Sequence, residues 1–292
     1  MDTATVLPSW NEGPAREAVL AFVGSVTTAG PGYVPPAGRI AAFDNDGTLW
    51  CEQPIYAQTD FVVRRFKEMV RDDPGLAERQ PFKAAAEDDI AWIQDIYVHE
   101  AELLEGLAEA FCDITADEFE ASARAFFATA THPTLGVPYT RTAYKPMREL
   151  VELLTAHDFR VYICSTGGRD FMRVISEETY GIPRERVIGS APVLDYRDGR
   201  FIRTREVEQP IADGPGKAVH LWTRTGRSPL LAGGNSDGDM EMLECARFGL
   251  LVRHDDAERE TAYDTGSERA LAAAETRGWT VVSMKRDFAT IF

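Results

Sequence analysis

Two aspartates, Asp44 and Asp46, stand two residues apart directly after the apolar run Ile40–Phe43. Ionised carboxylates at this spacing repel one another, and partial burial at the end of a strand raises the free energy of each charge. A bound cation, or a reaction in which both groups take part, would offset that repulsion. The segment taken alone also fits a surface turn closed by Gly47, with an aspartate side chain bonded to the backbone.

Three other polar segments contain residue types that bind phosphate or a hard cation. Residues 164–168 read Cys-Ser-Thr-Gly-Gly, and hydroxyl and amide groups at a helix start suit a phosphate. Residues 214–217 place Lys217 at the start of a predicted helix, and residues 233–239 are rich in the oxygen ligands that a hard cation prefers. Taken singly, these segments also fit a small-residue helix start, a solvated lysine and an acidic glycine-rich turn.

The elements expected to position these segments alternate between strand and helix. Apolar runs, separated by helical patterns, predict strands over residues 38–43, 159–164, 229–232, 248–252 and 279–284. A further strand, 187–194, is predicted to form a hairpin with 201–206 around Asp198-Gly199. This alternation predicts an α/β fold with a doubly wound, mostly parallel sheet. Ligands bind such a sheet at the carboxyl ends of its strands, where we expect the polar segments to lie.

A long insertion separates the first strand from the second. Residues 53–138 carry apolar stripes at helical spacing, and Thr115 and Glu118 have the spacing of a capping box at a helix start. This pattern predicts an inserted, all-helical domain. The expected domains are an N-terminal helix and loop that pack on the core (1–37), the core itself (38–52 and 139–292) and the helical insertion (53–138).

The composition argues against several kinds of partner. The chain has 292 residues and a formal net charge of −16, which disfavours nucleic acid and anionic membrane surfaces, because both need clustered Lys and Arg. No apolar run approaches the roughly 20 residues that a membrane span requires, and residues 1–10 lack the pattern of a secretory signal. The four cysteines form no close pair and no zinc-like spacing. We expect a cytoplasmic protein that acts on a small molecule, and the sequence leaves its oligomeric state open.

The four polar segments, in this order, resemble the haloacid dehalogenase-like (HAD) hydrolase superfamily. The matching pattern is Asp-x-Asp-Gly-Thr, a strand that ends in Ser, a Lys, and a Gly-Asn-x-x-x-Asp turn, and it spans residues 38–254. The chain is most similar to the phosphoserine phosphatase-type branch, since the helical insertion after the first motif resembles that family's cap. The resemblance implies a Rossmann-like core with a helical cap, and a Mg²⁺-dependent phosphatase that acts on a small phosphorylated metabolite.

The resemblance also implies catalytic roles for individual positions of this sequence. Asp44 would attack phosphorus and form an aspartyl-phosphate, while Asp46 would protonate the leaving alcohol and then activate water. Lys217 would neutralise charge on Asp44 and on the phosphoryl group. The phosphoryl oxygens would be bound by the lysine and by the second segment, namely Lys217, Gly167 and Ser165, with Thr166 as the alternative to Ser165.

A magnesium site follows from the same resemblance. Its ligands would be an Asp44 oxygen, the Asp46 carbonyl, and two positions of the last segment, Asn235 and Asp239. Asn235 stands where many relatives have an aspartate. Its amide oxygen can still bind Mg²⁺, but one charge is lost, so Asp237 is a candidate to assist.

Four residues near the start of the insertion are candidates for recognising the leaving group, namely Glu52, Gln53, Arg64 and Arg65. Gln53 stands where phosphoserine phosphatases carry a glutamate that reads the substrate's amino group. That difference argues against phosphoserine itself, unless the preceding Glu52 substitutes. For both arginines, a solvated helix face is the plainer interpretation.

Three other functions share part of this pattern. A phosphotransferase would use the same machinery and replace water with another acceptor. A signalling receiver domain also combines Asp, Ser or Thr, Lys and Mg²⁺, but its phosphoacceptor follows a separate upstream acidic pair, whereas here the pair itself follows the first core strand. A non-catalytic binding protein on the same fold would have little use for Asp46.

Overall fold

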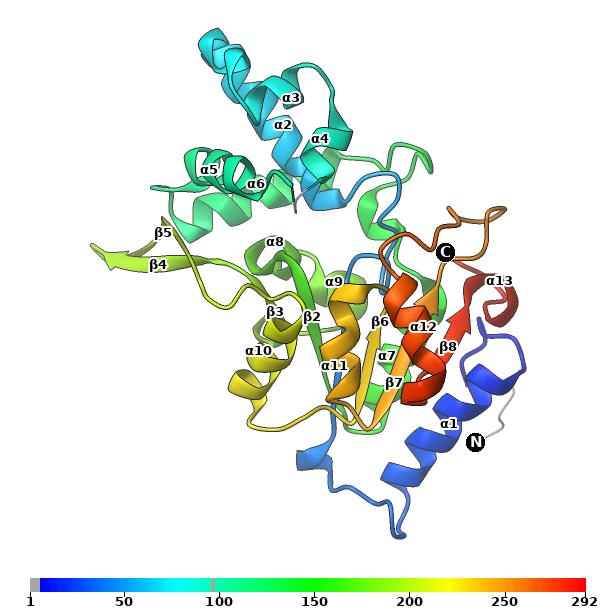
Figure 1. Ribbon diagram of the computed structural model, residues 1–292. Coiled ribbons are helices and arrows are strands. Elements are labelled where there is room, and N and C mark those ends of the chain that lie inside the picture. The colour runs from blue at the N-terminus through cyan, green and yellow to red at the C-terminus, as the bar shows by residue number, and fades with distance from the viewer. Residues whose placement is uncertain (1–5, 96–97) are drawn as a thin grey trace. The chain divides into compact units, whose positions relative to one another are not determined.

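The computed structural model describes residues 6–95 and 98–292 (Figure 1). Its internal contacts divide the chain into two units. The first, called the core unit here, comprises the chain up to Cys51, Thr140–Ser190 and Gln209–Phe292. The second, called the insert unit, comprises Glu52–Tyr139 and Ala191–Glu208. Each unit is therefore assembled from segments that lie far apart in the sequence.

The core unit is built on a six-stranded parallel sheet with the order β3-β2-β1-β6-β7-β8. Its strands are β1 (Ile40–Phe43), β2 (Arg160–Gly168), β3 (Val187–Ser190), β6 (Leu231–Gly234), β7 (Phe248–Arg253) and β8 (Thr280–Ser283). The central strand β1 is buried along its whole length. A strand covered on both faces needs an uninterrupted apolar run, which is why Ile40–Phe43 does not alternate with polar residues.

Helices flank this sheet (Figure 1). They are α1 (Pro14–Thr27), α7 (Lys145–Ala156), α8 (Arg169–Arg173), α9 (Ser176–Tyr180), α10 (Pro215–Thr225), α11 (Met240–Glu244), α12 (Glu268–Arg277) and α13 (Met284–Asp287). On one face of β1, Ile40 and Ala42 belong to a buried cluster with Leu221 of α10, Met242 of α11 and Ala270 of α12. The predicted doubly wound α/β core is thus confirmed.

One predicted strand is divided in the structure. Residues 187–194 were expected to form a single strand, but β3 ends at Ser190 and a new strand, β4 (Pro192–Arg197), follows after Ala191. β3 lies in the parallel sheet beside β2, while β4 pairs antiparallel with β5 (Arg200–Val207). The sequence changes character at this point, from the buried run of β3 to the mainly exposed residues of β4.

The insert unit contains five α-helices among its described residues, and it also contains the β4–β5 hairpin. The helices are α2 (Ala57–Asp72), α3 (Phe82–Ala86), α4 (Ile90–Gln94), α5 (Glu100–Phe111) and α6 (Ala116–Thr129). The predicted capping box is present at the start of α6, with Thr115 and Glu118 bonded reciprocally. Phe61 of α2 contacts the rings of Phe111 and Phe119. This aromatic packing explains the apolar stripes in the sequence.

The hairpin makes the insert unit different from the predicted all-helical insertion. The sequence predicts that residues 191–208 belong to the core. In the structure their contacts group them with the insert helices. Asp113 N donates to the Arg203 carbonyl and Arg203 N donates to the Ile114 carbonyl, both at 2.9 Å. The Arg203 guanidinium also lies 3.8 Å from the centre of the Phe119 ring. Such contacts join distant segments and are invisible in the local pattern.

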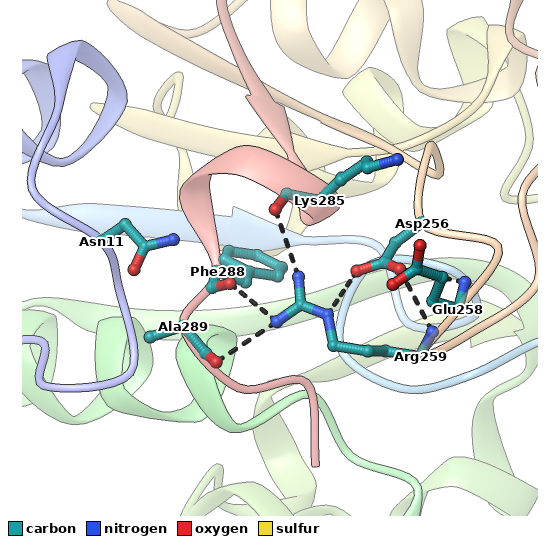
Figure 2. A pocket seen from close by; sticks show the side chains of 7 residues that line it. All are labelled: Asn11, Asp256, Glu258, Arg259, Lys285, Phe288 and Ala289. Carbon is teal, nitrogen blue, oxygen red and sulfur yellow. Dashed lines mark hydrogen bonds and ion pairs between the residues drawn. The ribbon is translucent and has the colours of Figure 1, made fainter.

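Within the core unit, Arg259 binds the C-terminal segment through hydrogen bonds (Figure 2). The guanidinium pairs with the buried carboxylate of Asp256 and donates to the carbonyl oxygens of Met284, Lys285, Phe288 and Ala289. Figure 2 shows the side chains that line a pocket, and Arg259 is one of them. None of the four polar segments lines this pocket. No helix in the described part of the chain is long and apolar enough to cross a membrane.

Candidate active site

The carboxyl ends of neighbouring strands bring three of the polar segments together. In the sheet register, Phe43 lies beside Ile163 of β2 and Gly233 of β6. Just beyond this level lie Asp44, directly after β1, Ser165, two residues further along β2, and Asn235, directly after β6. Asp44 N also donates to the Gly233 carbonyl at 2.9 Å, which continues the pairing past the end of β1. The sheet topology therefore places these residues at one edge.

Lys217 connects the two acidic segments. Its Nζ donates to Asp44 Oδ1 at 2.8 Å and to Asp239 Oδ1 at 2.5 Å, and all three side chains are buried. The lysine lies in the first turn of α10, next to Gly216. A Cβ at position 216 would stand 1.9 Å from the Ile211 carbonyl oxygen, so the chain turns there in a way that only glycine permits.

The site holds more negative charge than Lys217 can neutralise. The pKa of Asp44 is raised to about 8: burial is the largest cause, Lys217 opposes the rise, and the charges of Asp239 and Asp46 add to it. Burial lowers the pKa of Lys217, but the carboxylates of Asp239 and Asp44 outweigh that effect and raise it overall, so the lysine stays charged. Because three carboxylates lie near one ammonium group, the charge of the site favours binding of a second cation.

Asp46 lies on the turn that follows Asp44 and is half-buried. Trp50 Nε1 donates to Asp46 Oδ1 at 2.7 Å. Burial raises the pKa of Asp46, and the hydrogen bond from Trp50 opposes that rise. The turn itself depends on Gly47, whose φ of 71° lies in the left-handed region that glycine adopts without strain. The raised pKa favours the protonated form of Asp46 relative to an ordinary aspartate.

The strand predicted over residues 159–164 continues to Gly168, so the hydroxyl and amide groups of residues 165–168 lie in the last part of β2. Gly167 N donates to Ser165 Oγ at 3.3 Å, and Ser165 is buried. Thr166 Oγ1 instead donates to Asp213 Oδ1 at 2.9 Å. Because the Thr166 hydroxyl proton is already used, Ser165 is the better placed of the two hydroxyls to donate to a phosphoryl oxygen.

The predicted metal ligands separate into two groups. Asn235 Oδ1 accepts from Thr48 Oγ1 at 3.0 Å, and this bond orients the amide oxygen. Asp239 is bound differently, because Oδ1 accepts from Lys217 and Oδ2 accepts from Asn235 N, Ser236 N and Ser236 Oγ at 3.0–3.1 Å. These contacts suit a residue that holds the lysine and the loop.

Asp237 is also directed at the protein. Its Oδ1 accepts from Ala270 N at 2.8 Å, in the first turn of α12. Within residues 6–95 and 98–292, no three His, Cys, Asp or Glu side chains are grouped as a metal site. A hard cation can nevertheless use the mixed oxygen set of the Asp44 carboxylate, the Asp46 carbonyl and the Asn235 amide, because Mg²⁺ takes few protein ligands and retains waters.

A family model described as haloacid dehalogenase-like hydrolase matches residues 41–244, which is more than half of the chain. The chain belongs to this family. The match confirms the resemblance inferred from the four motifs, and the six-stranded parallel sheet agrees with the expected HAD core. The protein is therefore a hydrolase of the HAD family.

Two solved structures with TM-scores above 0.5 support the fold assignment. A conserved functionally unknown protein from Anaerococcus prevotii DSM 20548 is 14% identical, covers 94% of each chain and has a TM-score of 0.61. A protein of unknown function from Bordetella pertussis Tohama I is 19% identical over 84% of this chain and 97% of that chain, with a TM-score of 0.54. A phosphoserine phosphohydrolase-like protein from Francisella tularensis subsp. tularensis SCHU S4 is 17% identical over 74% of this chain and 88% of that chain, with a TM-score of 0.45. No curated protein matches the chain.

The four candidates for substrate recognition lie in the insert unit of this HAD protein. Glu52 is buried, and Gln53 is half-buried. Arg64 forms a bidentate ion pair with Asp60, in which Nε donates to Oδ1 at 2.9 Å and Nη2 donates to Oδ2 at 3.0 Å. The Arg64 side chain is half exposed. Arg65 lies 3.5 Å from Glu68 in an exposed pair. The arginine contacts agree with a solvated helix face, and a role for any of the four in binding substrate stays a prediction.

Several residues near the HAD motifs were not foreseen. Thr48 is the last residue of the first motif and Trp50 stands two residues after it, and each bonds a predicted site residue. Asp213, just before the lysine motif, accepts from Thr166. His254, directly after β7, donates to the Gly47 carbonyl of the first motif. Of these, only His254 could have been predicted from the sequence. It follows shortly after a predicted core strand, as Asp44 and Asn235 do.

Proposed function

We propose that this HAD hydrolase is a magnesium-dependent phosphatase that works through an aspartyl-phosphate on Asp44. The observation that carries the proposal is the buried ammonium group of Lys217, which contacts both Asp44 and Asp239. A lysine in that position stabilises an anionic nucleophile and the charge that develops when a phosphoryl group approaches it. A purely structural ion pair would not require Asp46 on the next turn.

In the first step, an oxygen of Asp44 attacks phosphorus while the bond from phosphorus to the leaving oxygen breaks. Asp46 gives its proton to that oxygen, so the alcohol leaves in neutral form. In the second step, the ionised Asp46 takes a proton from water, which attacks phosphorus and breaks the bond to Asp44. Inorganic phosphate leaves, and both carboxyl groups return to their starting states. The raised pKa of Asp46 supports this role, since a general acid must hold its proton near working pH.

The remaining residues of the site orient the phosphoryl group. We propose that Ser165 donates to its oxygens, and that the Gly167 amide, which donates to Ser165 Oγ at 3.3 Å in this structure, donates to a phosphoryl oxygen when substrate binds. Lys217 neutralises part of the phosphoryl charge. Asp239 holds Lys217 in place, so its part in cation binding would be indirect. The Asp44 carboxylate, the Asp46 carbonyl and Asn235 would hold Mg²⁺, which when bound supplies the charge neutralisation that phosphoryl transfer requires.

The substrate we propose is a phosphomonoester of a small metabolite. A net charge of −16 disfavours phosphorylated nucleic acid as a substrate, because the chain would repel the polyanion outside the site. A small anion needs only the local charge of Lys217 and the cation. Glu52, Gln53, Arg64 and Arg65 are the candidates for reading its leaving group.

The test is phosphate release from 4-nitrophenyl phosphate in the presence of Mg²⁺, compared with Asp44→Asn. We expect hydrolysis by the unaltered protein and a loss of at least about 1,000-fold in the variant, because the amide cannot act as nucleophile. Asp158→Asn is the matched control, since Asp158 is exposed at the other end of β2. Turnover that persists in Asp44→Asn would contradict the nucleophile assignment.

A further inference from the structure

The turn that carries the catalytic aspartates is held from outside the four motifs. His254 Nε2 lies 2.8 Å from the Gly47 carbonyl oxygen, and Gly47 itself is buried. A carbonyl oxygen can only accept a hydrogen bond, so Nε2 must carry a proton and donate it. The imidazole therefore fixes the peptide group between Gly47 and Thr48, one residue after Asp46.

A buried carboxyl group orients this imidazole. Glu260 Oε2 lies 3.2 Å from His254 Nδ1, and the two side chains are 1% and 2% exposed. The hydrogen bond between Nδ1 and Oε2 fixes the orientation of the ring. A histidine that is bonded through one nitrogen presents the other nitrogen in a defined direction.

Two more side chains hold the carboxyl group. Glu260 Oε1 accepts from Tyr144 Oη at 2.9 Å and from Cys51 Sγ at 3.2 Å. The ring of Tyr263 stacks on His254, with the centroids 4.4 Å apart and the planes 22° apart. All of these residues belong to the core unit. Burying a carboxyl group is unfavourable unless its oxygens are bonded, so this arrangement is too specific to be incidental packing.

Gly47 stands between two groups that the proposed chemistry uses. On one side is Asp46, whose carboxylate is held by Trp50. On the other side is Thr48, whose hydroxyl donates to Asn235. A shift of the Gly47 peptide would therefore displace the proton donor, and small displacements of catalytic groups reduce rates steeply.

We infer that His254, oriented by Glu260, is a positioning residue for the general acid Asp46. This inference rests on the proposed phosphatase function. Loss of the imidazole leaves the Gly47 carbonyl without its donor and lets the turn move, so proton transfer to the leaving group suffers first. Binding of the phosphoryl group, which depends on Ser165 and Lys217, suffers less.

The leaving group provides the readout. 4-Nitrophenolate leaves without much help from an acid, whereas phenolate needs the proton from Asp46. We expect His254→Ala to lower kcat/KM for 4-nitrophenyl phosphate about 10-fold and that for phenyl phosphate by about 100-fold. Asp46→Asn should show the same dependence on the leaving group. An equal loss for both esters in His254→Ala would overturn the inference, because a merely destabilised protein loses activity equally on both.

Conservative variants separate positioning from folding. Glu260→Gln can donate its amide proton to Nδ1 and keep the Nε2 proton on the side of Gly47, so we expect it to retain most activity on phenyl phosphate. Glu260→Leu cannot do so and should resemble His254→Ala. Equal activity of the two Glu260 variants would contradict the proposed orientation of the ring. His157→Ala is the control, because this half-buried histidine precedes β2 at the opposite end from Ser165.

Amide hydrogen exchange over residues 44–52 gives a readout that does not depend on turnover. We expect faster exchange there in His254→Ala and unchanged exchange in His157→Ala. If the unaltered protein releases no phosphate, the proposed function fails, while faster exchange would still show that His254 holds the turn. If the protein is active and exchange over 44–52 is unchanged in His254→Ala, the positioning role fails alone.

Discussion

At the scale of single residues, Asp44 is the group whose charge the core unit tolerates least. It is buried at the end of the central strand, and two other carboxylates lie near it. Lys217 is in contact with it but is shared with Asp239. Without another cation, the protonated form of Asp44 is therefore favoured up to about pH 8. This makes the metal-free protein sensitive to pH in a predictable direction.

We expect the free energy of unfolding of the metal-free protein to fall as the pH rises from about 5 to 8. The folded-state pKa of Asp44 is about 8 and its ordinary value is 3.8, so in this range the unfolded chain loses a proton that the folded chain keeps. The contribution is at most about 1.4 kcal/mol per pH unit. Urea denaturation in a chelator at several pH values measures it. Asp44→Asn should remove this slope, and parallel curves for the two proteins would contradict the assignment.

At the scale of the elements, the site depends on how each strand passes into the next segment. Asp44 and Asn235 follow the paired strands β1 and β6, and Ser165 lies in the second half of β2. Lys217 is placed by the sharp entry into α10 instead, where Gly216 packs on the Ile211 carbonyl. The lysine therefore relies on the shape of a turn more than on the sheet.

We expect Gly216→Ala to reduce both stability and activity. The added methyl group would stand 1.9 Å from a backbone oxygen, so the start of α10 must move. Overpacking of this kind costs about 1–3 kcal/mol. The matched control is Gly24→Ala within α1, where a Cβ meets nothing within 4 Å. It should be neutral or stabilising by up to about 1 kcal/mol, since alanine favours a helix interior. Thermal denaturation and phosphate release measure both variants, and an active, stable Gly216→Ala would contradict this view of the turn.

The sequence predicts the strands and their polar ends well, because apolar runs and motif spacing are local signals. The capping box at Thr115 and the strand before Asp44 are examples. It does not predict the partners of Arg203, which joins the hairpin to the insert helices, or those of Glu260, which lies in an irregular segment after β7. Those contacts join residues far apart in the chain. The contact of Asp239 with Lys217 joins two motifs and was not predicted either, while its role as a metal ligand stays a prediction.

At the scale of the whole molecule, the end of the chain supports the segment that follows β7. Arg259 joins α13 and its flanking residues to Asp256 (Figure 2). The next residue, Glu260, contacts His254 and orients its ring. Burial raises the pKa of Asp256, but its hydrogen bonds with Arg259 outweigh this and lower it overall. The ion pair thus stabilises the fold above the ordinary pKa of an aspartate, and that contribution is lost as the pH falls.

We expect Arg259→Leu to destabilise the protein by about 3–5 kcal/mol at neutral pH, because a buried carboxylate loses its partner. The difference from the unaltered protein should shrink at acid pH, when Asp256 becomes protonated. Arg277→Leu is the control, since its pair with Glu244 is largely exposed and is worth at most about 1 kcal/mol. Equal midpoints of urea denaturation for the two variants would show that the contacts of Arg259 contribute little to the free energy of unfolding.

The hydrogen bond between Trp50 and Asp46 also couples the indole ring to the charge of the carboxyl group. An indole senses charge close to its ring, and here its N–H lies 2.7 Å from the carboxyl group that is proposed to exchange protons with substrate and water. Trp50 is buried, and the chain contains five tryptophans that can be replaced singly. The fluorescence of this one ring therefore gives the protein an intrinsic optical signal for the protonation of Asp46.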